Sequence, residues 1–152
     1  MAPGSALIPR PPGSPSGAEA LRFRFALPAR PASAAGARRL TRDRLAVWKL
    51  RGDLRDTAAL IVSELVTNAV VHTASALVVC ELRRLDHLLR IAVQDQGRLT
   101  GGPRLRVSSD DEHGRGLFLV DALSQAWGSH DAEDASGRVV WSELAHGAGQ
   151  PC

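Results

Sequence analysis

The sequence predicts an α+β domain in which helices cover one face of a mostly antiparallel sheet, giving a two-layer sandwich. Two observations support this fold class. The chain of 152 residues has room for one domain with a hydrophobic core. Its strand-like segments come in pairs that polar turns join, whereas only a few segments have helical spacing.

The first half of this domain is expected to contain one strand and two helices. Apolar and charged residues alternate over residues 21–27, as in a strand with one face buried and one in water. Helical composition spans residues 32–51, and Gly52 is expected to end this helix. Asp53 is then the expected cap of a second helix, over about 53–73.

The second half is expected to contain two hairpins separated by a helix. Apolar residues 76–82 and 88–94 flank a polar turn, which predicts the first hairpin. A helix is expected over about 116–126. Residues 126–130 and 138–144 then form the closing hairpin.

The expected domain spans residues 21–145. Residues 1–20 are rich in Pro, Gly and Ser and are expected to form a disordered tail, and residues 146–152 a flexible one. Residues 98–113 show no periodicity. Because a long irregular loop inside a domain is usually functional or mobile, we expect a lid there.

Composition narrows the class of protein. The hydrophobic content of 44% is typical of a globular chain, and no apolar run reaches the roughly 18 residues that cross a bilayer. The first residues lack the apolar core of a signal peptide, so a cytoplasmic protein without a membrane partner is expected. Cys80 falls in an expected strand and Cys152 ends the chain, so neither indicates a disulfide framework.

The net charge of +3 is unevenly distributed. Residues 1–55 carry eleven Lys/Arg against three Asp/Glu, or +8, and the remainder carries eight against thirteen, or −5. Basic surfaces bind phosphate backbones, but here several arginines fall on an expected helix and no nucleic-acid motif accompanies them. We therefore expect a solvated basic face and no direct nucleic-acid partner.

Polar residues interrupt the second expected helix along one stripe. Glu64, Asn68 and His72 follow one another at spacings of four residues on an otherwise apolar helix. Such a stripe is most often the solvated side of an amphipathic helix. It also places a carboxylate and a carboxamide one turn apart, and these groups suit a proton acceptor and a ligand of a hard cation.

Two later segments favour the second interpretation. A strand-like run ends in Asp95, with Gly97 two residues later, and Gly114-Arg115-Gly116 stands directly before an apolar helical run that begins at Leu117. In the order Glu-x-x-x-Asn, Asp-x-Gly and Gly-x-Gly, these motifs resemble the N, G1 and G2 boxes of the GHKL ATPase superfamily. That superfamily includes gyrase, heat-shock chaperone, histidine kinase and mismatch-repair ATPases.

The short chain and the phrase Ser63-Glu-Leu-Val-Thr-Asn-Ala69 resemble one branch of that superfamily, the small anti-sigma-factor serine/threonine kinases. The resemblance covers about residues 21–145 and implies the Bergerat ATP-binding fold. It implies that Asn68 binds Mg²⁺ and that Glu64 acts on the attacking hydroxyl or water. This matches the chemistry of the stripe.

The resemblance also implies roles at the base of the nucleotide. Asp95 would accept a hydrogen bond from the adenine amino group, although an isolated Asp at a strand end is more often a cap. Gly97 would let the backbone approach the base, but the second glycine of this box is replaced here. Ser142 matches a Thr/Ser that supports the adenine contact; the alternative is a polar pair across the sheet.

Gly114 and Gly116 would expose backbone N–H groups at a helix start, where the helix dipole favours anions. Together with Arg115 and Leu117 they would form the phosphate-binding part of the site. For Arg115 the alternative is a solvent-facing side chain.

The function that the resemblance implies is an ATP- and Mg²⁺-dependent protein serine/threonine kinase. Such a protein transfers the ATP γ-phosphate to a serine or threonine of an antagonist protein and regulates a sigma factor. The alternative is a nucleotide-dependent binding module that holds ATP and a protein partner with little or no catalysis. The implied partners are a sigma factor, an anti-anti-sigma-factor-like protein or both, and a homodimer is one of the oligomeric states left open.

Overall fold

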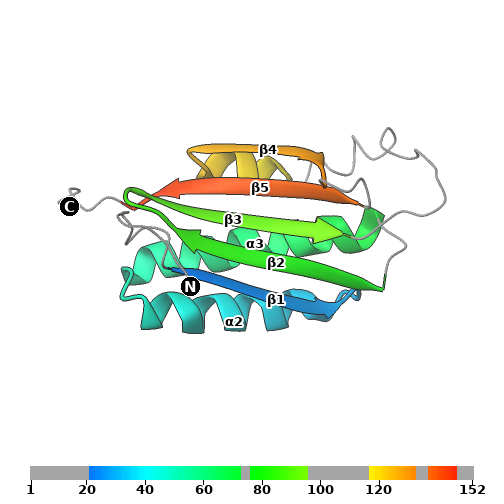
Figure 1. Cartoon of the computed structure of the whole chain (residues 1–152), viewed down its shortest axis with the longest axis horizontal. Helices are drawn as coiled ribbons and strands as arrows, with labels where there is room; N and C mark the ends of the chain where they lie inside the picture. The colour runs from blue at the N-terminus through cyan, green and yellow to red at the C-terminus, as the bar shows by residue number, and fades with distance from the viewer. Residues whose placement is uncertain (1–20, 73–75, 96–116, 133–136, 147–152) are drawn as a thin grey trace, which may run out of the picture.

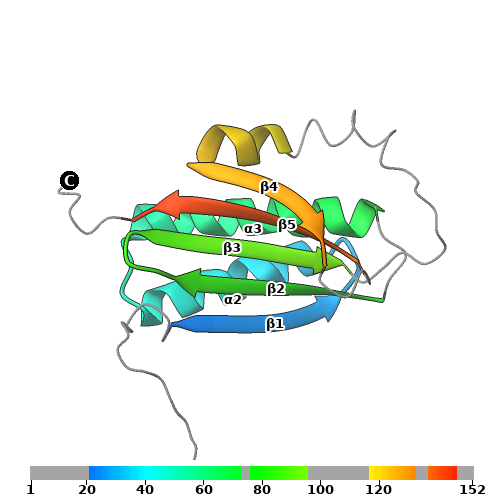
Figure 2. The ribbon, with the colours of Figure 1, turned by 45° about the horizontal axis from the view of Figure 1, so that its top comes forward.

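A five-stranded antiparallel sheet forms one layer of the protein within residues 21–72, 76–95, 117–132 and 137–146, the part of the chain that the computed structural model describes. The strands are β1 (Arg22–Pro28), β2 (Leu77–Arg84), β3 (Leu88–Asp95), β4 (Ala126–Asp131) and β5 (Arg138–Ala145), in the spatial order β1-β2-β3-β5-β4. Helices α2 (Ser33–Val47) and α3 (Gly52–His72) and the helical residues 117–123 lie on one face of this sheet (Figures 1 and 2). The predicted two-layer α+β fold is confirmed.

Alternation along the strands separates a helix-covered face from an open face. On β2 and β3 the side chains buried under the helices are Val78, Cys80, Leu82, Leu89, Ile91 and Val93. The antiparallel register keeps them together, as in the pair Cys80 and Val93. Burial raises the pKa of the Cys80 thiol to about 12, so this residue is an unreactive part of the core.

Helix α3 is the central element of the helical layer. It packs against both α2 and β3. Its fully or nearly buried residues are Leu54, Ala58, Ala59, Ile61, Val62, Ser63, Leu65, Val66 and Ala69. This set occupies more than half of the helix circumference, as the apolar spacing of the sequence predicted.

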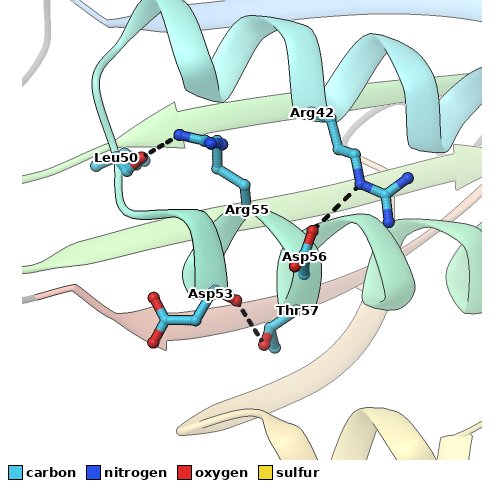
Figure 3. Close-up of polar contacts among 6 residues, drawn as sticks. All are labelled: Arg42, Leu50, Asp53, Arg55, Asp56 and Thr57. Carbon is cyan, nitrogen blue, oxygen red and sulfur yellow. Dashed lines mark hydrogen bonds and ion pairs between the residues drawn. The ribbon is translucent and has the colours of Figure 1, made fainter.

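The connection between α2 and α3 differs from the prediction (Figure 3). Helix α2 ends at Val47, four residues early, because Lys49 adopts a left-handed conformation with φ of 60°. Gly52 begins α3 instead of ending α2, and Asp53 lies in the first turn of α3 rather than before it. Arg55 closes the connection by donating from Nη1 to the Leu50 carbonyl at 2.7 Å.

The helix before β4 ends at residue 123, before the expected end at about 126. Val120 is fully buried in this helix, whereas Leu123 is 38% exposed. The chain turns at this point into β4, where Gln125 donates its backbone N–H to the Glu143 carbonyl.

The expected tail 1–20 and the expected lid 98–113 lie outside the described residues. His146 is described, and its backbone N–H donates to the His87 carbonyl at 3.0 Å. None of the helices within the described ranges has the length and apolar character that a membrane span requires.

Candidate functional site

Glu64, Asn68 and His72 lie along one margin of α3, between its buried and its exposed sides. All three residues are half-buried, whereas the neighbouring Thr67 and Val71 are exposed. The stripe is therefore partly withdrawn from water. A carboxylate and an amide in this position remain reachable for a ligand, while the packing of α3 holds their backbone in place.

The stripe is rotated away from the Asp56 position, where α3 contacts α2. On the α2 side, Asp56 accepts a hydrogen bond from Nε of Arg42 at 3.4 Å (Figure 3). A helix turns by about 100° per residue, which places Glu64 roughly 80° and Asn68 roughly 120° further round the axis than Asp56. The amide and the carboxylate therefore point in a different direction from the Asp56 side chain that bonds to α2, and both are half-buried.

Asp95, the last residue of β3, is half-buried and lies on the helix-covered face of the sheet. The register pairs it with Val78 of β2, a fully buried residue of that face. Its Oδ1 accepts the backbone N–H of Arg138 at 3.2 Å. The backbone of Arg138, the first residue of β5, thus orients the carboxylate, and β3 fixes the position of the Asp95 backbone.

Gly137 fits closely against Asp95. A Cβ atom added at Gly137 would lie 1.9 Å from the Asp95 carbonyl oxygen and 3.0 Å from Oδ1. Only glycine allows this approach without displacing the strand end. Sequence reasoning missed Gly137 and Arg138 as neighbours of the site; the one signal was a glycine directly before an apolar strand.

The ends of α3 and β3 lie at the same end of the molecule. In Figures 1 and 2 the arrowhead of β3 points toward the end where α3 finishes, and β5 begins there. His72 and Asp95 therefore belong to one end of the two-layer fold. Glu64 lies about 12 Å back from His72 along the helix axis, and Asn68 lies between them.

Ser142 is on the same face of the sheet but further from this end. It is fully buried and pairs with Ile91, four residues from Arg138, or about 13 Å along the strand. Its Oγ lies 2.6 Å from Oγ of Ser124, so the hydroxyl already has a polar partner before β4. A supporting role for Ser142 at the adenine stays a prediction.

The remaining predicted site residues are Gly97, Gly114, Arg115 and Gly116, and they lie outside the described residues. Leu117 is described: it is half-buried and packs against the core. It fixes the start of the described helix on the helix-covered face of the sheet. The predicted phosphate contacts themselves stay predictions.

The donor set fits Mg²⁺ held with a nucleotide. Asn68 offers a neutral amide oxygen, and Glu64 a carboxylate one turn away, and both groups are half-buried. Mg²⁺ keeps several waters and takes one or two protein oxygens together with substrate phosphates. Within the described ranges no group of three or more His, Cys, Asp or Glu residues is arranged to hold a metal ion.

Comparison with known proteins identifies a family and a related fold. Residues 27–142 match the family model described as "Histidine kinase-like ATPase domain". Among solved structures, the chain is similar to the crystal structure of the RsbU and RsbW domains of Rv1364c from Mycobacterium tuberculosis, with a TM-score of 0.57 and 20% sequence identity. This likeness covers 82% of the present chain and 32% of that chain, and at this identity it concerns the fold alone. A search of curated proteins found no match.

Proposed function

The chain belongs to the family of histidine kinase-like ATPase domains, and from this membership we propose that it is a protein serine/threonine kinase of the anti-sigma-factor type. It binds Mg-ATP, transfers the γ-phosphate to a serine or threonine of an antagonist protein, and thereby regulates a sigma factor. The phrase at residues 63–69 supports this branch of the family. Such a protein acts in the cytoplasm, on an anti-anti-sigma-factor-like substrate.

One observation carries the proposal. The end of the sheet that holds the Asp95 carboxylate also receives the C-terminal end of α3, whose half-buried stripe bears Glu64 and Asn68 (Figure 2). A base-recognising acid, a metal-ligating amide and a proton acceptor are thus carried by two packed elements. Phosphoryl transfer requires a bound metal and a group that orients the nucleophile in fixed positions, and recognition of the base holds the nucleotide in place for them.

Asp95 recognises the adenine amino group in this proposal. The backbone N–H of Arg138 donates to Oδ1 of this carboxylate. That bond orients the side chain on the helix-covered face. Gly97 brings the backbone to the base, and Gly114, Arg115, Gly116 and Leu117 form the phosphate-binding segment.

Asn68 and Glu64 divide the chemistry at the phosphates. Bound Mg-ATP supplies the phosphoryl group and much of the charge neutralisation. Asn68 holds the metal through its amide oxygen, which suits a hard cation. Glu64, one turn earlier, orients the hydroxyl of the protein substrate and takes up its proton.

The substitution Glu64→Gln separates catalysis from binding. The amide keeps the shape of the side chain but does not accept the proton, so Mg-ATP affinity should change less than threefold, while single-turnover phosphotransfer should fall by about 10²–10⁴. Asp56→Asn, the same chemical change on the α2 side of α3, is the matched control and should leave both quantities unchanged. Transfer at the wild-type rate by Glu64→Gln would show that this residue is not the base.

Asn68→Ala should act on binding instead. It removes a metal ligand, so the affinity for Mg-ATP should fall while the affinity for ATP in EDTA changes little. Thr67→Ala, at the exposed neighbouring position, is its control. If the wild-type protein binds ATP and a sigma factor but phosphorylates no candidate antagonist, the chain is the binding module rather than the kinase.

A further inference from the structure

The face of the sheet that the helices leave open carries a row of arginines. Arg22, Arg83 and Arg90 are direct cross-strand neighbours on β1, β2 and β3. Alternation places all three on the open face, which is turned toward the viewer in Figure 1. Arg24 lies in the adjacent row. Like charges directly opposite each other destabilise a sheet, so the fold itself gives no reason for this row.

Two glutamates on the same face neutralise only part of this charge. Glu81 pairs with Arg22, and Glu143 accepts a hydrogen bond from Nη1 of Arg90 at 2.9 Å. The side chains of Arg24 and Arg83 make no hydrogen bond or ion pair within the described part of the chain. Arg83, at the centre of the row, is therefore left available to an anion.

Trp141 lies beside the row, against Arg90. The ring of Trp141 lies over Gly128, where an added Cβ would come within 2.9 Å of the ring, and Arg90 stacks on the ring at 4.6 Å from its centre. Ala92 is the cross-strand neighbour of Trp141 on the other side. Arg90 thus occupies one face of the indole, and that face is not open to stacking on a nucleic-acid base.

We propose that this open face, defined by Arg22, Arg24, Arg83 and Arg90, binds the acidic surface of a partner protein. Guanidinium groups recognise carboxylates through paired hydrogen bonds, and arginine and tryptophan are enriched at protein interfaces. The face lies on the other side of the sheet from the nucleotide site. The proposal therefore goes beyond the proposed function and does not depend on it.

Three other occupants fit this face less well. A second copy related by two-fold symmetry would set the same arginine-rich surface against itself. The chain's own ends, residues 1–20 and 147–152, contain Glu19 as their one acidic side chain. Proteins that bind single-stranded nucleic acid use aromatic rings on which bases stack, whereas on this face Arg90 already stacks on the ring of Trp141.

The test uses a 20-residue poly-L-glutamate as the acidic probe and the full chain. In ¹H–¹⁵N spectra the probe should shift the Trp141 indole and the amides of β2 and β3, and increasing salt should weaken its binding. Arg83→Glu should weaken binding at least tenfold. Arg39→Glu, which makes the same charge change at an exposed position of α2, should weaken it less than twofold.

Arg24→Glu provides a second variant on the same face should Arg83→Glu fail to fold, as judged by thermal unfolding. Equal weakening by the β-sheet and α2 variants would overturn the proposal, since it would indicate non-specific attraction. Tighter binding of a 20-nucleotide oligo(dT) to the same residues would overturn it in favour of nucleic acid. Self-association that Arg83→Glu abolishes would overturn it in favour of a second copy.

Discussion

Asp95 reaches the helix-covered face of the sheet with its backbone pressed against Gly137. The two residues are 42 positions apart in the chain, and the pairing of β3 with β5 brings them together. The Asp-x-Gly motif identified Asp95 from the sequence alone. Its supporting residues were not predictable in the same way, because a cross-strand register depends on which strands become neighbours. Along the chain β4 comes between β3 and β5, but in the sheet β3 and β5 are direct neighbours.

Gly137→Ala should therefore impair the candidate site through Asp95. The new methyl group must displace the Asp95 backbone or β5, which should lower the free energy of unfolding by about 1–3 kcal/mol and weaken ATP binding. Denaturant unfolding and calorimetry measure the two effects.

Gly36→Ala is the control for this substitution. Apart from its chain neighbours and its own helix backbone, nothing lies within 4 Å of a Cβ added at Gly36, inside α2, so alanine should raise the free energy of unfolding by about 0.5–1 kcal/mol. Gly137→Ala with unchanged stability and ATP affinity would contradict the close packing described for Asp95.

At the scale of whole elements, the strands were predictable to within one or two residues. Their alternating and apolar runs have a period of two that no helix shares, and polar turns bound them. The end of α2 was not predictable. Gly52 is a stronger stop signal than Lys49, yet Lys49 takes the left-handed position, and Gly52 serves as the start of α3.

Lys49→Gly should stabilise this connection. A left-handed conformation costs an L-residue about 1–2 kcal/mol, and glycine avoids this cost but loses more chain entropy on folding. The net gain in the free energy of unfolding should be about 0.5–1 kcal/mol, measured by denaturant titration. Lys49→Ala removes the same charge and keeps the strain, so it should give no gain; an equal gain from both would assign the effect to charge instead.

The scale of the whole molecule decides which predicted residues can act together. The helix spacing of the stripe placed Glu64 and Asn68 on one side of α3 from the sequence alone. That the C-terminal end of α3 meets the end of β3 required the fold, because the direction of a helix across a sheet has no local signal. The register also places Ser142 opposite Ile91, four residues before Asp95, although the resemblance had implied that Ser142 and Asp95 both serve the contact with adenine.

Titration of Mg-ATP into the wild-type chain and into Asp95→Asn tests the central claim most directly. Loss of a hydrogen bond to a charged acceptor costs about 1.5–3 kcal/mol, so Asp95→Asn should bind roughly 10–150-fold more weakly. Asp86→Asn, at the exposed turn between β2 and β3, should bind like the wild type. Equal affinity of Asp95→Asn and the wild type, with thermal unfolding unchanged, would contradict the assignment of this sheet end as the nucleotide site.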